Sequence, residues 1–384
     1  CSRDFYVRGT TGMVKKKIVK KTAPRAIRTT PSQLVRQLER LDRELVKRLG
    51  ERARLVQKLH KLGAPDDALQ VGANGQPQVL NSVVEWNKGP LSDRSVRSVF
   101  REILSGCRAL LRPVRVAYLG PMYSYTYLAT IERFGESVEL APVATISAVF
   151  EELSRKHADY GVVPLENSTD GRVVDTLGMF ARLPLRICGE VQLRIRHNLL
   201  AKCPRNEIQE VYSKPQALSQ CRDWLAKHLP WARTVEMTST AAAAQLAAGK
   251  QGAAAVASLL AASSYGLDVV AANIEDNNNN ITRFAIIGGE AASRTRRDKT
   301  ALMFEIPHKP GALADVMAVF KRSKLNLTWI ESFPMASNEN EYLFFVELEG
   351  HQTEAKVRRA LGALERRTVR LEVLGSYAKS DPVD

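Results

Sequence analysis

Three loops at the ends of predicted strands hold the residues of this 384-residue chain that are best suited to chemistry. The first, YLGPMYSYTY at 118–127, leads from a strand into a helix whose first turn carries the hydroxyls of Ser124 and Thr126. Free backbone amides at a helix N-terminus, together with hydroxyls, can bind an anion. The same residues would also serve as an ordinary helix N-cap, so both interpretations stay open.

The second loop, PLENSTDGRV at 164–173, follows the strand pattern GVV. It offers an acid, an amide and two hydroxyls in succession, on Glu166, Asn167, Ser168 and Thr169. Gly171 permits a sharp turn just after them. The pattern fits a polar binding loop and an ordinary surface loop equally well.

The third loop begins with four asparagines in DNNNNITRFAIIGG, residues 276–289. A linker would be rich in Gly, Ser or Pro and would end at a domain edge, whereas this run ends in an apolar strand. Thr282 and Arg283 open that strand, and a guanidinium can bind a carboxylate through two hydrogen bonds. We therefore interpret the run as part of a site, and we expect Phe284 to pack within the strand.

Composition limits the possible functions. The net charge is +15, and residues 1–30 contribute nine cations and one acid to it. We predict that this basic tail is disordered, and nucleic-acid binding is the weaker interpretation. No long uncharged apolar window predicts a membrane span, and no secretory signal is evident. The five cysteines are scattered, so we expect no disulfide framework, no metal and a cytoplasmic protein.

Residues 31–111 read as a small all-α unit. A long amphipathic helix is predicted because apolar residues recur at spacings of three and four. These residues are Leu34, Leu38, Leu41, Leu45 and Leu49. Two further helical patterns follow at 79–86 and 92–111.

Strand and helix patterns alternate between residues 113 and 290, which predicts two α/β lobes with mostly parallel sheets and a hinge near 190 and 275. Ligands of such sheets bind beyond the carboxyl ends of the strands. Residues 299–378 follow the order βαββαβ, the ferredoxin-like split motif. The predicted fold class is therefore multidomain: all-α, then two-lobed α/β, then α+β.

Several segments together resemble one enzyme family. These are LGP at 119–121, GVVPLENSTDG at 161–171, VYSKPQALSQC at 211–221, TSTAAAA at 238–244 and NITRF at 280–284. In this order they resemble prephenate dehydratase, whose catalytic domain has a type II periplasmic-binding-protein-like fold. KPGAL and ESFP resemble the ACT regulatory domain that follows it. The N-terminal unit resembles the AroQ-type chorismate mutase of bifunctional P-proteins.

The resemblance implies an enzyme of L-phenylalanine biosynthesis that converts prephenate to phenylpyruvate, without cofactor, as a homodimer or homotetramer. Thr282 would assist the leaving hydroxyl, and Glu166 or an ordered water would relay the proton. Substrate would be held by Ser124, Thr126, Asn167, Ser168, Thr169 and Arg283. No residue decides between prephenate and arogenate.

The chain departs from the family in the cleft. Tyr123 stands where many relatives have Gly, so its ring must turn outward or contribute its hydroxyl to the pocket. Lys214 stands where His is common and would add a cation near the cleft. Met122 and Tyr123 also motivate a rival of another class, a non-catalytic sensor of aromatic ligands.

The resemblance places an allosteric phenylalanine site in the C-terminal domain. Its residues would be Gly311, Ala312, Leu313, Glu331 and Ser332. Phe333 replaces the Arg of the usual ESRP motif, and the loss of that cation would weaken or alter the regulation.

The mutase-like unit has lost most of the cations that would clamp chorismate. Of the family's site residues only Arg52 is kept, whereas Val35, Gly63, Gly75, Gln76, Cys107 and Leu111 stand at the other positions. We expect the unit to fold and mediate dimerisation with little or no mutase activity. The nearest alternative is a fully bifunctional enzyme that uses other cations, such as Arg36 or Arg54.

Overall fold

The computed structural model describes residues 30–64, 75–169, 171–288, 292–295, 297–334 and 342–383, and the chain divides into two units, 1–52 and 53–384. Most of the first unit's described part is helix α1 (Pro31–Lys61). The five leucines of the predicted stripe lie on it, each 41% to 60% exposed. The predicted long amphipathic helix is thus present, and the leucines of its apolar stripe are exposed. The predicted basic tail, residues 1–30, falls almost entirely outside the described residues.

The second unit begins within α1, at Ala53, and continues through α2 (Gly75–Trp86) and α3 (Asp93–Ala109). The Ser92 hydroxyl caps α3 by accepting a hydrogen bond from the Ser95 amide at 3.1 Å. Val56 and Cys107 form a small buried apolar cluster with Ile103 and Leu111 packed against it.

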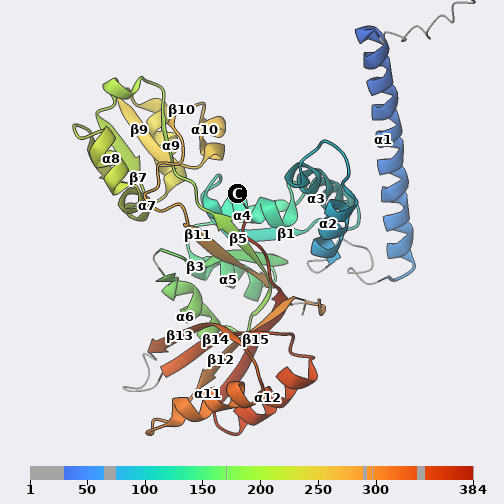
Figure 1. Cartoon of the computed structure of the whole chain (residues 1–384), viewed down its shortest axis with the longest axis vertical. Helices are drawn as coiled ribbons and strands as arrows, with labels where there is room; N and C mark the ends of the chain where they lie inside the picture. The colour runs from blue at the N-terminus through green and yellow to red at the C-terminus, as the bar shows by residue number, and fades with distance from the viewer. Residues whose placement is uncertain are drawn as a thin grey trace, which may run out of the picture. The chain divides into compact units, whose positions relative to one another are not determined.

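The first lobe is a sheet with helices on its faces (Figure 1). Its strand order is β2-β1-β3-β11-β5; the first three strands are parallel, and β11 runs antiparallel to both neighbours. The elements are β1 (Arg115–Leu119), α4 (Tyr125–Phe134), β2 (Glu139–Val143), α5 (Ile146–Ser154), β3 (Tyr160–Asn167), β4 (Gly171–Arg172), α6 (Val174–Arg182), β5 (Arg186–Arg194) and β11 (Ile281–Gly288).

The second lobe has strand order β10-β6-β9-β7-β8. Its elements are β6 (Asn198–Ala201), the 3-10 helix η1 (Arg205–Glu207), β7 (Glu210–Ser213), α7 (Pro215–Gln220), α8 (Arg222–His228), β8 (Arg233–Glu236), α9 (Thr240–Gly249), β9 (Ala253–Ala257), α10 (Leu259–Tyr265) and β10 (Asp268–Ala271). The chain enters this lobe between β5 and β6 and leaves it between β10 and β11. The segment 191–201 therefore contains the end of β5 and the whole of β6, which belong to different sheets.

The C-terminal domain has the predicted βαββαβ order and the strand order β13-β14-β12-β15. Its elements are β12 (Asp298–Glu305), α11 (Ala312–Arg322), β13 (Leu327–Pro334), β14 (Tyr342–Glu349), α12 (Ala355–Glu365) and β15 (Arg370–Ala378). Side chains alternate along each strand. Leu302 and Phe344 therefore pack toward α11 and α12, whereas Met303 and Phe345 pack against the first lobe.

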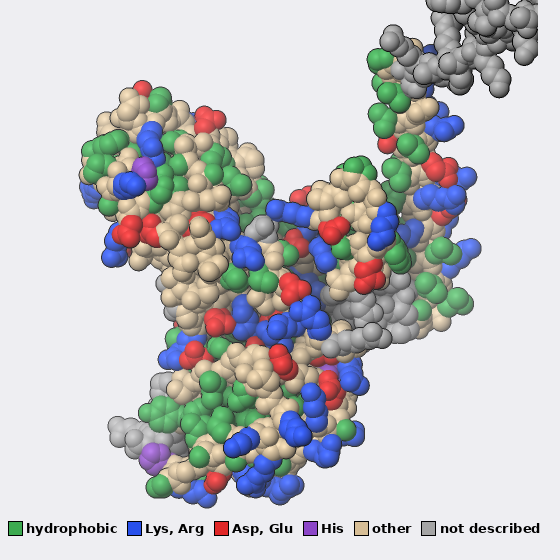
Figure 2. Space-filling model, viewed as in Figure 1, with side chains coloured by type: hydrophobic (Ala, Val, Ile, Leu, Met, Phe, Trp, Pro, Cys, Tyr) green, Lys and Arg blue, Asp and Glu red, His purple; other side chains and the backbone are tan. Residues whose placement is uncertain are grey.

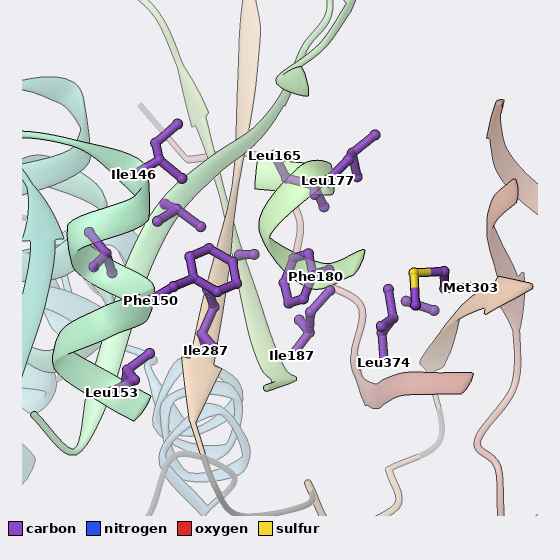
Figure 3. Close-up of a cluster of buried hydrophobic side chains, with 14 of the residues drawn as sticks. Ile146, Phe150, Leu153, Leu165, Leu177, Phe180, Ile187, Ile287, Met303 and Leu374 are labelled. Carbon is purple, nitrogen blue, oxygen red and sulfur yellow. The ribbon is translucent and has the colours of Figure 1, made fainter. Parts of the chain in front are cut away.

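A continuous apolar core joins the first lobe to the C-terminal domain (Figure 3). Phe150 and Phe180 meet edge to face at 5.0 Å between ring centroids, and Met303 and Leu374 belong to the same cluster. A Cβ on Gly375, whose φ is +155°, would lie 2.0 Å from the Ile187 carbonyl oxygen, so only glycine allows this backbone approach.

The charge excess is not confined to the N-terminal tail. Lys and Arg side chains are numerous on the C-terminal domain in the view of Figure 2. Exposed examples on or beside its helices are Lys321, Arg322, Arg358, Arg359, Arg366 and Arg367. Within the described residues, no helix is long and apolar enough to cross a membrane, and no group of three His, Cys, Asp or Glu side chains could hold a metal ion.

Candidate active site

A cleft of about 920 Å³ lies between the two lobes. Three of the helices that begin at the cleft have a hydroxyl as their N-cap: Ser124 for α4, Thr145 for α5 and Ser239 for α9. Each hydroxyl accepts a hydrogen bond from the amide three residues on, at 3.0 to 3.3 Å. Three positive helix ends in one cleft favour an anionic ligand.

Among the described residues that line the cleft, Lys214 and His197 are the only basic side chains and Asp175 is the only acid. Burial lowers the pKa of His197, so its imidazole is neutral at pH 7. Its Nδ1 lies 3.2 Å from the Tyr125 hydroxyl, and its Nε2 lies 2.9 Å from Gln220 Oε1. Lys214 is exposed and therefore supplies the side-chain positive charge of the cleft, as the sequence predicted.

Thr282 lines the cleft at the start of β11. Its Oγ1 accepts a hydrogen bond from Asn167 Nδ2 at 2.7 Å. The same amide donates to Asn280 Oδ1 at 2.9 Å, and Asn280 in turn donates to Gln220 Oε1 at 2.7 Å. Because Asn167 fills an acceptor position of the Thr282 hydroxyl, the hydroxyl proton is directed elsewhere and can be donated to a ligand.

The other predicted substrate-binding hydroxyls divide into two groups. Thr126 lines the cleft with Ser124, whereas Ser168 and Thr169 lie outside its lining. Ser168 Oγ donates to the Asn279 carbonyl at 2.8 Å and accepts from the Ile281 amide at 2.9 Å. The Thr169 amide donates to Asn167 Oδ1 at 2.9 Å. These contacts fix the loop, and neither residue lines the cleft.

The ring of Tyr123 turns away from the cleft. Its backbone has φ +65°, and its ring packs edge to face on Tyr127 at 5.4 Å and on Tyr265 of α10 at 5.6 Å. Tyr123 is not among the residues that line the cleft, which favours the outward orientation over the hydroxyl-in-pocket alternative. Phe284 is 2% exposed and packs in the core, although an edge of it reaches the cleft wall.

Glu166 and Arg283 lie on the opposite face of the sheet from Thr282. Arg283 Nη1 donates to Glu166 Oε2 at 2.7 Å, and neither residue lines the cleft. Strand alternation is the reason, because neighbouring residues on β3 and on β11 must face opposite ways. The structure therefore argues against Glu166 as proton relay and against Arg283 as a carboxylate ligand.

Thr145 and Ser239 line the cleft but are not among the residues predicted from the sequence, although a hydroxyl directly before a helical pattern is a readable N-cap signal.

The predicted effector motifs lie apart in the single chain. Gly311, with φ +82°, and the next two residues, Ala312 and Leu313, line a pocket of about 360 Å³. Glu331 and Ser332 on β13 lie outside it, and Glu331 pairs with Arg172 of β4 at 2.5 Å.

Phe333, which replaces the expected Arg, packs edge to face on Phe345, with ring centroids 6.3 Å apart. The edge of its ring also lies 3.5 Å from where a Cβ on Gly178 of α6 would be. Phe333 thus packs at the contact between the C-terminal domain and the first lobe.

The predicted mutase positions carry few polar groups. In the first unit, Arg52 is present on α1 and Val35 is 53% exposed. In the second unit, Gly63 adopts φ +73°, and Cys107 and Leu111 belong to the apolar cluster around Val56.

Comparison with known proteins agrees with this organisation. The prephenate dehydratase family model matches residues 116–292, and the chorismate mutase type II model matches residues 34–112. A bifunctional chorismate mutase/prephenate dehydratase of Aquifex aeolicus is 38% identical over 353 residues, which cover 91% of this chain and 98% of the relative.

Two solved structures match about two thirds of the chain. Prephenate dehydratase of Arthrobacter aurescens, in complex with L-Phe, has a TM-score of 0.64 and 33% identity over 69% of this chain and 90% of that one. GqqA, described as a novel type of quorum-quenching acylase, has a TM-score of 0.63 and 27% identity over 69% and 98%. Fold and cleft together define a prephenate dehydratase preceded by a chorismate-mutase-type helical domain. The chain belongs to the bifunctional chorismate mutase/prephenate dehydratase family.

Proposed function

We propose that the interlobe cleft converts prephenate to phenylpyruvate, with Thr282 as the residue that donates a hydrogen bond to the leaving 4-hydroxyl. The carbon–carbon bond to the ring carboxylate breaks to release carbon dioxide, its electron pair completes the aromatic ring, and the carbon–oxygen bond at position 4 breaks. The departing hydroxide takes up a proton and leaves as water. The observation that carries the proposal is the hydrogen bond from Asn167 to Thr282 Oγ1, which occupies an acceptor position of that oxygen and leaves its proton to be donated to a ligand.

The positive groups of the cleft suit a dianionic substrate. The carboxylate that leaves as neutral carbon dioxide should not be clamped by a cation, because that contact would stabilise the ground state more than the transition state. We therefore assign Lys214 and the N-terminus of α9 to the carboxylate that stays on the side chain. Because Glu166 does not line the cleft, we assign the proton relay to a water molecule that enters the cleft with the substrate.

The test is to incubate the purified chain with prephenate and to follow phenylpyruvate, then to repeat the assay with arogenate and follow phenylalanine. Turnover of prephenate supports the proposal. Tight binding without turnover would instead support the sensor alternative. The acylase neighbour shows that this fold hosts another chemistry, so an acyl-amide substrate belongs in the same assay.

A second proposal concerns the helical domain, which we infer folds without efficient mutase activity. Its support is the apolar cluster that contains Cys107 and Leu111, together with Val35 and Gly63 at positions that would carry cations. Chorismate is the discriminating substrate. Its conversion to prephenate at ordinary enzymatic rates would establish the bifunctional alternative.

The C-terminal domain is proposed to bind L-phenylalanine through the backbone at Gly311, Ala312 and Leu313, with Glu331 and Ser332 as the second half of the site. The solved relative in complex with L-Phe supports L-phenylalanine as the ligand, and the residues are those of the matching sequence motifs. The exposed leucine stripe of α1 supports a homo-oligomer, a dimer or a tetramer. We propose a cytoplasmic location because the scattered cysteines predict no disulfide framework. Sedimentation of the purified protein measures the oligomer directly.

A further inference from the structure

A cluster of buried charges joins the dehydratase domain to the C-terminal domain. Its members are Arg283 on β11, Glu190 on β5, Lys299 on β12 and Glu347 on β14, and we call it the interdomain charge cluster. Arg283 Nη2 donates to Glu190 Oε2 at 3.1 Å and to Glu347 Oε1 at 2.5 Å. Lys299 Nζ lies 3.2 Å from Glu190 Oε2 and 3.5 Å from Glu347 Oε2.

Each domain contributes one cation and one acid to the cluster, and all four side chains are at most 12% exposed. Charges are rarely buried so deeply unless they are paired, and removal of one partner leaves another uncompensated. Although burial alone would raise the pKa of Glu347, Arg283 and Lys299 outweigh it and hold that pKa below its ordinary value. The cluster is thus an ionic contact that neither domain completes by itself.

The cluster lies directly behind the proposed catalytic hydroxyl. On β11, Thr282 faces the cleft and Arg283 faces the cluster, and on β3 the paired residues Asn167 and Glu166 do the same. The ladder changes register between Arg283 and Phe284, so these contacts fix the strand where regular pairing is interrupted. A shift of Arg283 would be carried by one peptide unit to Thr282.

A second contact joins the C-terminal domain to the same part of the sheet. Arg172 on β4 pairs with Glu331 on β13 at 2.5 Å, and Arg172 lies opposite Glu166 in the β3–β4 ladder. The C-terminal domain therefore holds both the catalytic strand and the hairpin beside it.

We propose that Arg283 is a positioning residue through which the C-terminal domain controls the placement of Thr282. This inference rests on the proposed function of Thr282 as the hydroxyl that acts on substrate. It assigns Arg283 a role at the domain contact, and it makes Glu347, which does not line the cleft, a determinant of turnover.

The test uses the full chain with Glu347→Gln, which keeps the side-chain shape and removes the charge. We expect kcat for prephenate to fall about tenfold with KM within about twofold, because a small displacement of a catalytic group costs rate more than binding. Amide hydrogen exchange in residues 281–284 should become faster. The matched control is Glu372→Gln, whose partner Arg370 lies on the same strand. In this control kcat, KM and the amide exchange in residues 281–284 should all stay unchanged.

Tyr377→Phe is a gentler second variant that removes only the hydroxyl that donates to Glu347 Oε1 at 2.7 Å. It should give smaller changes in the same direction, even if Glu347→Gln folds poorly. Unchanged kcat and unchanged exchange at 281–284 in folded variants would overturn the inference, whereas absence of wild-type turnover would overturn only the proposed function, because the exchange measurement needs no substrate.

Discussion

Thr282 and Arg283 are neighbours on β11 whose side chains have partners on opposite faces of one sheet. Thr282 Oγ1 accepts from Asn167 at 2.7 Å in the cleft wall, whereas Arg283 donates to Glu166 at 2.7 Å on the face that meets the C-terminal domain. The paired residues Asn167 and Glu166 are likewise neighbours, on β3. One residue step therefore separates the proposed chemistry from the domain contact.

Removal of the Thr282 hydroxyl tests its proposed role in the cleft. Thr282→Ala should lower kcat on the order of 10²-fold and leave prephenate binding nearly intact, as for a lost proton-donating contact. Single-turnover rates and equilibrium binding measure the two effects separately. Thr282→Ser keeps the hydroxyl and should retain most of the turnover, and near-normal kcat in the alanine variant would remove Thr282 from the mechanism.

The orientation of the Thr282 proton gives a second prediction. In Asn167→Asp the donor amide becomes a carboxylate oxygen, which would accept the Thr282 proton that the substrate needs. We expect kcat to fall about tenfold or more with a smaller change in KM. Asn326→Asp introduces the same charge at an exposed position of the C-terminal domain and is the control. Equal rates in the two variants would contradict this orientation.

Lys214 should contribute to binding more than to chemistry. A hydrogen bond to a charged group is worth about 1.5–3 kcal/mol, so Lys214→Met should raise KM for prephenate about tenfold or more. Because the carboxylate it holds stays on the product, kcat should change little. Lys214→Arg retains the charge and should recover most of the affinity, whereas an unaltered KM in the methionine variant would place the substrate carboxylate elsewhere.

The sequence predicts the cleft residues better than the domain contact. Ser124 and Thr282 line the cleft, and the sequence points to them because a strand end and a helix start are local patterns. Period-two alternation predicts opposite faces for Arg283 and Thr282, whereas the family motif that they share implies a substrate role for both. Glu190 and Glu347 lie 93 and 64 positions from Arg283, and no local pattern predicts such pairings.

Regulation should depend on the backbone at Gly311. Its φ of +82° would cost an alanine about 1–3 kcal/mol, although a Cβ there would meet no neighbour. Gly311→Ala should therefore displace the turn and weaken L-phenylalanine binding about tenfold in a calorimetric titration. The control is Gly362→Ala in α12, where a Cβ also has open space and no positive φ. Equal affinity in the two variants would argue against a site at this turn.

His197 should make the protein less stable in mild acid. Burial lowers its pKa in the folded state below 6.5, the value it regains when the chain unfolds. The unfolded chain therefore binds the proton more readily, and the stability from neutral His197 is complete above pH 6.5 and is lost as pH falls through the folded-state pKa. His197→Gln cannot titrate, so its free energy of unfolding should fall less between pH 7.5 and pH 5 than that of the wild type. Urea denaturation at the two pH values measures both differences, and an equal loss of stability in the two proteins would show that other groups cause the acid sensitivity.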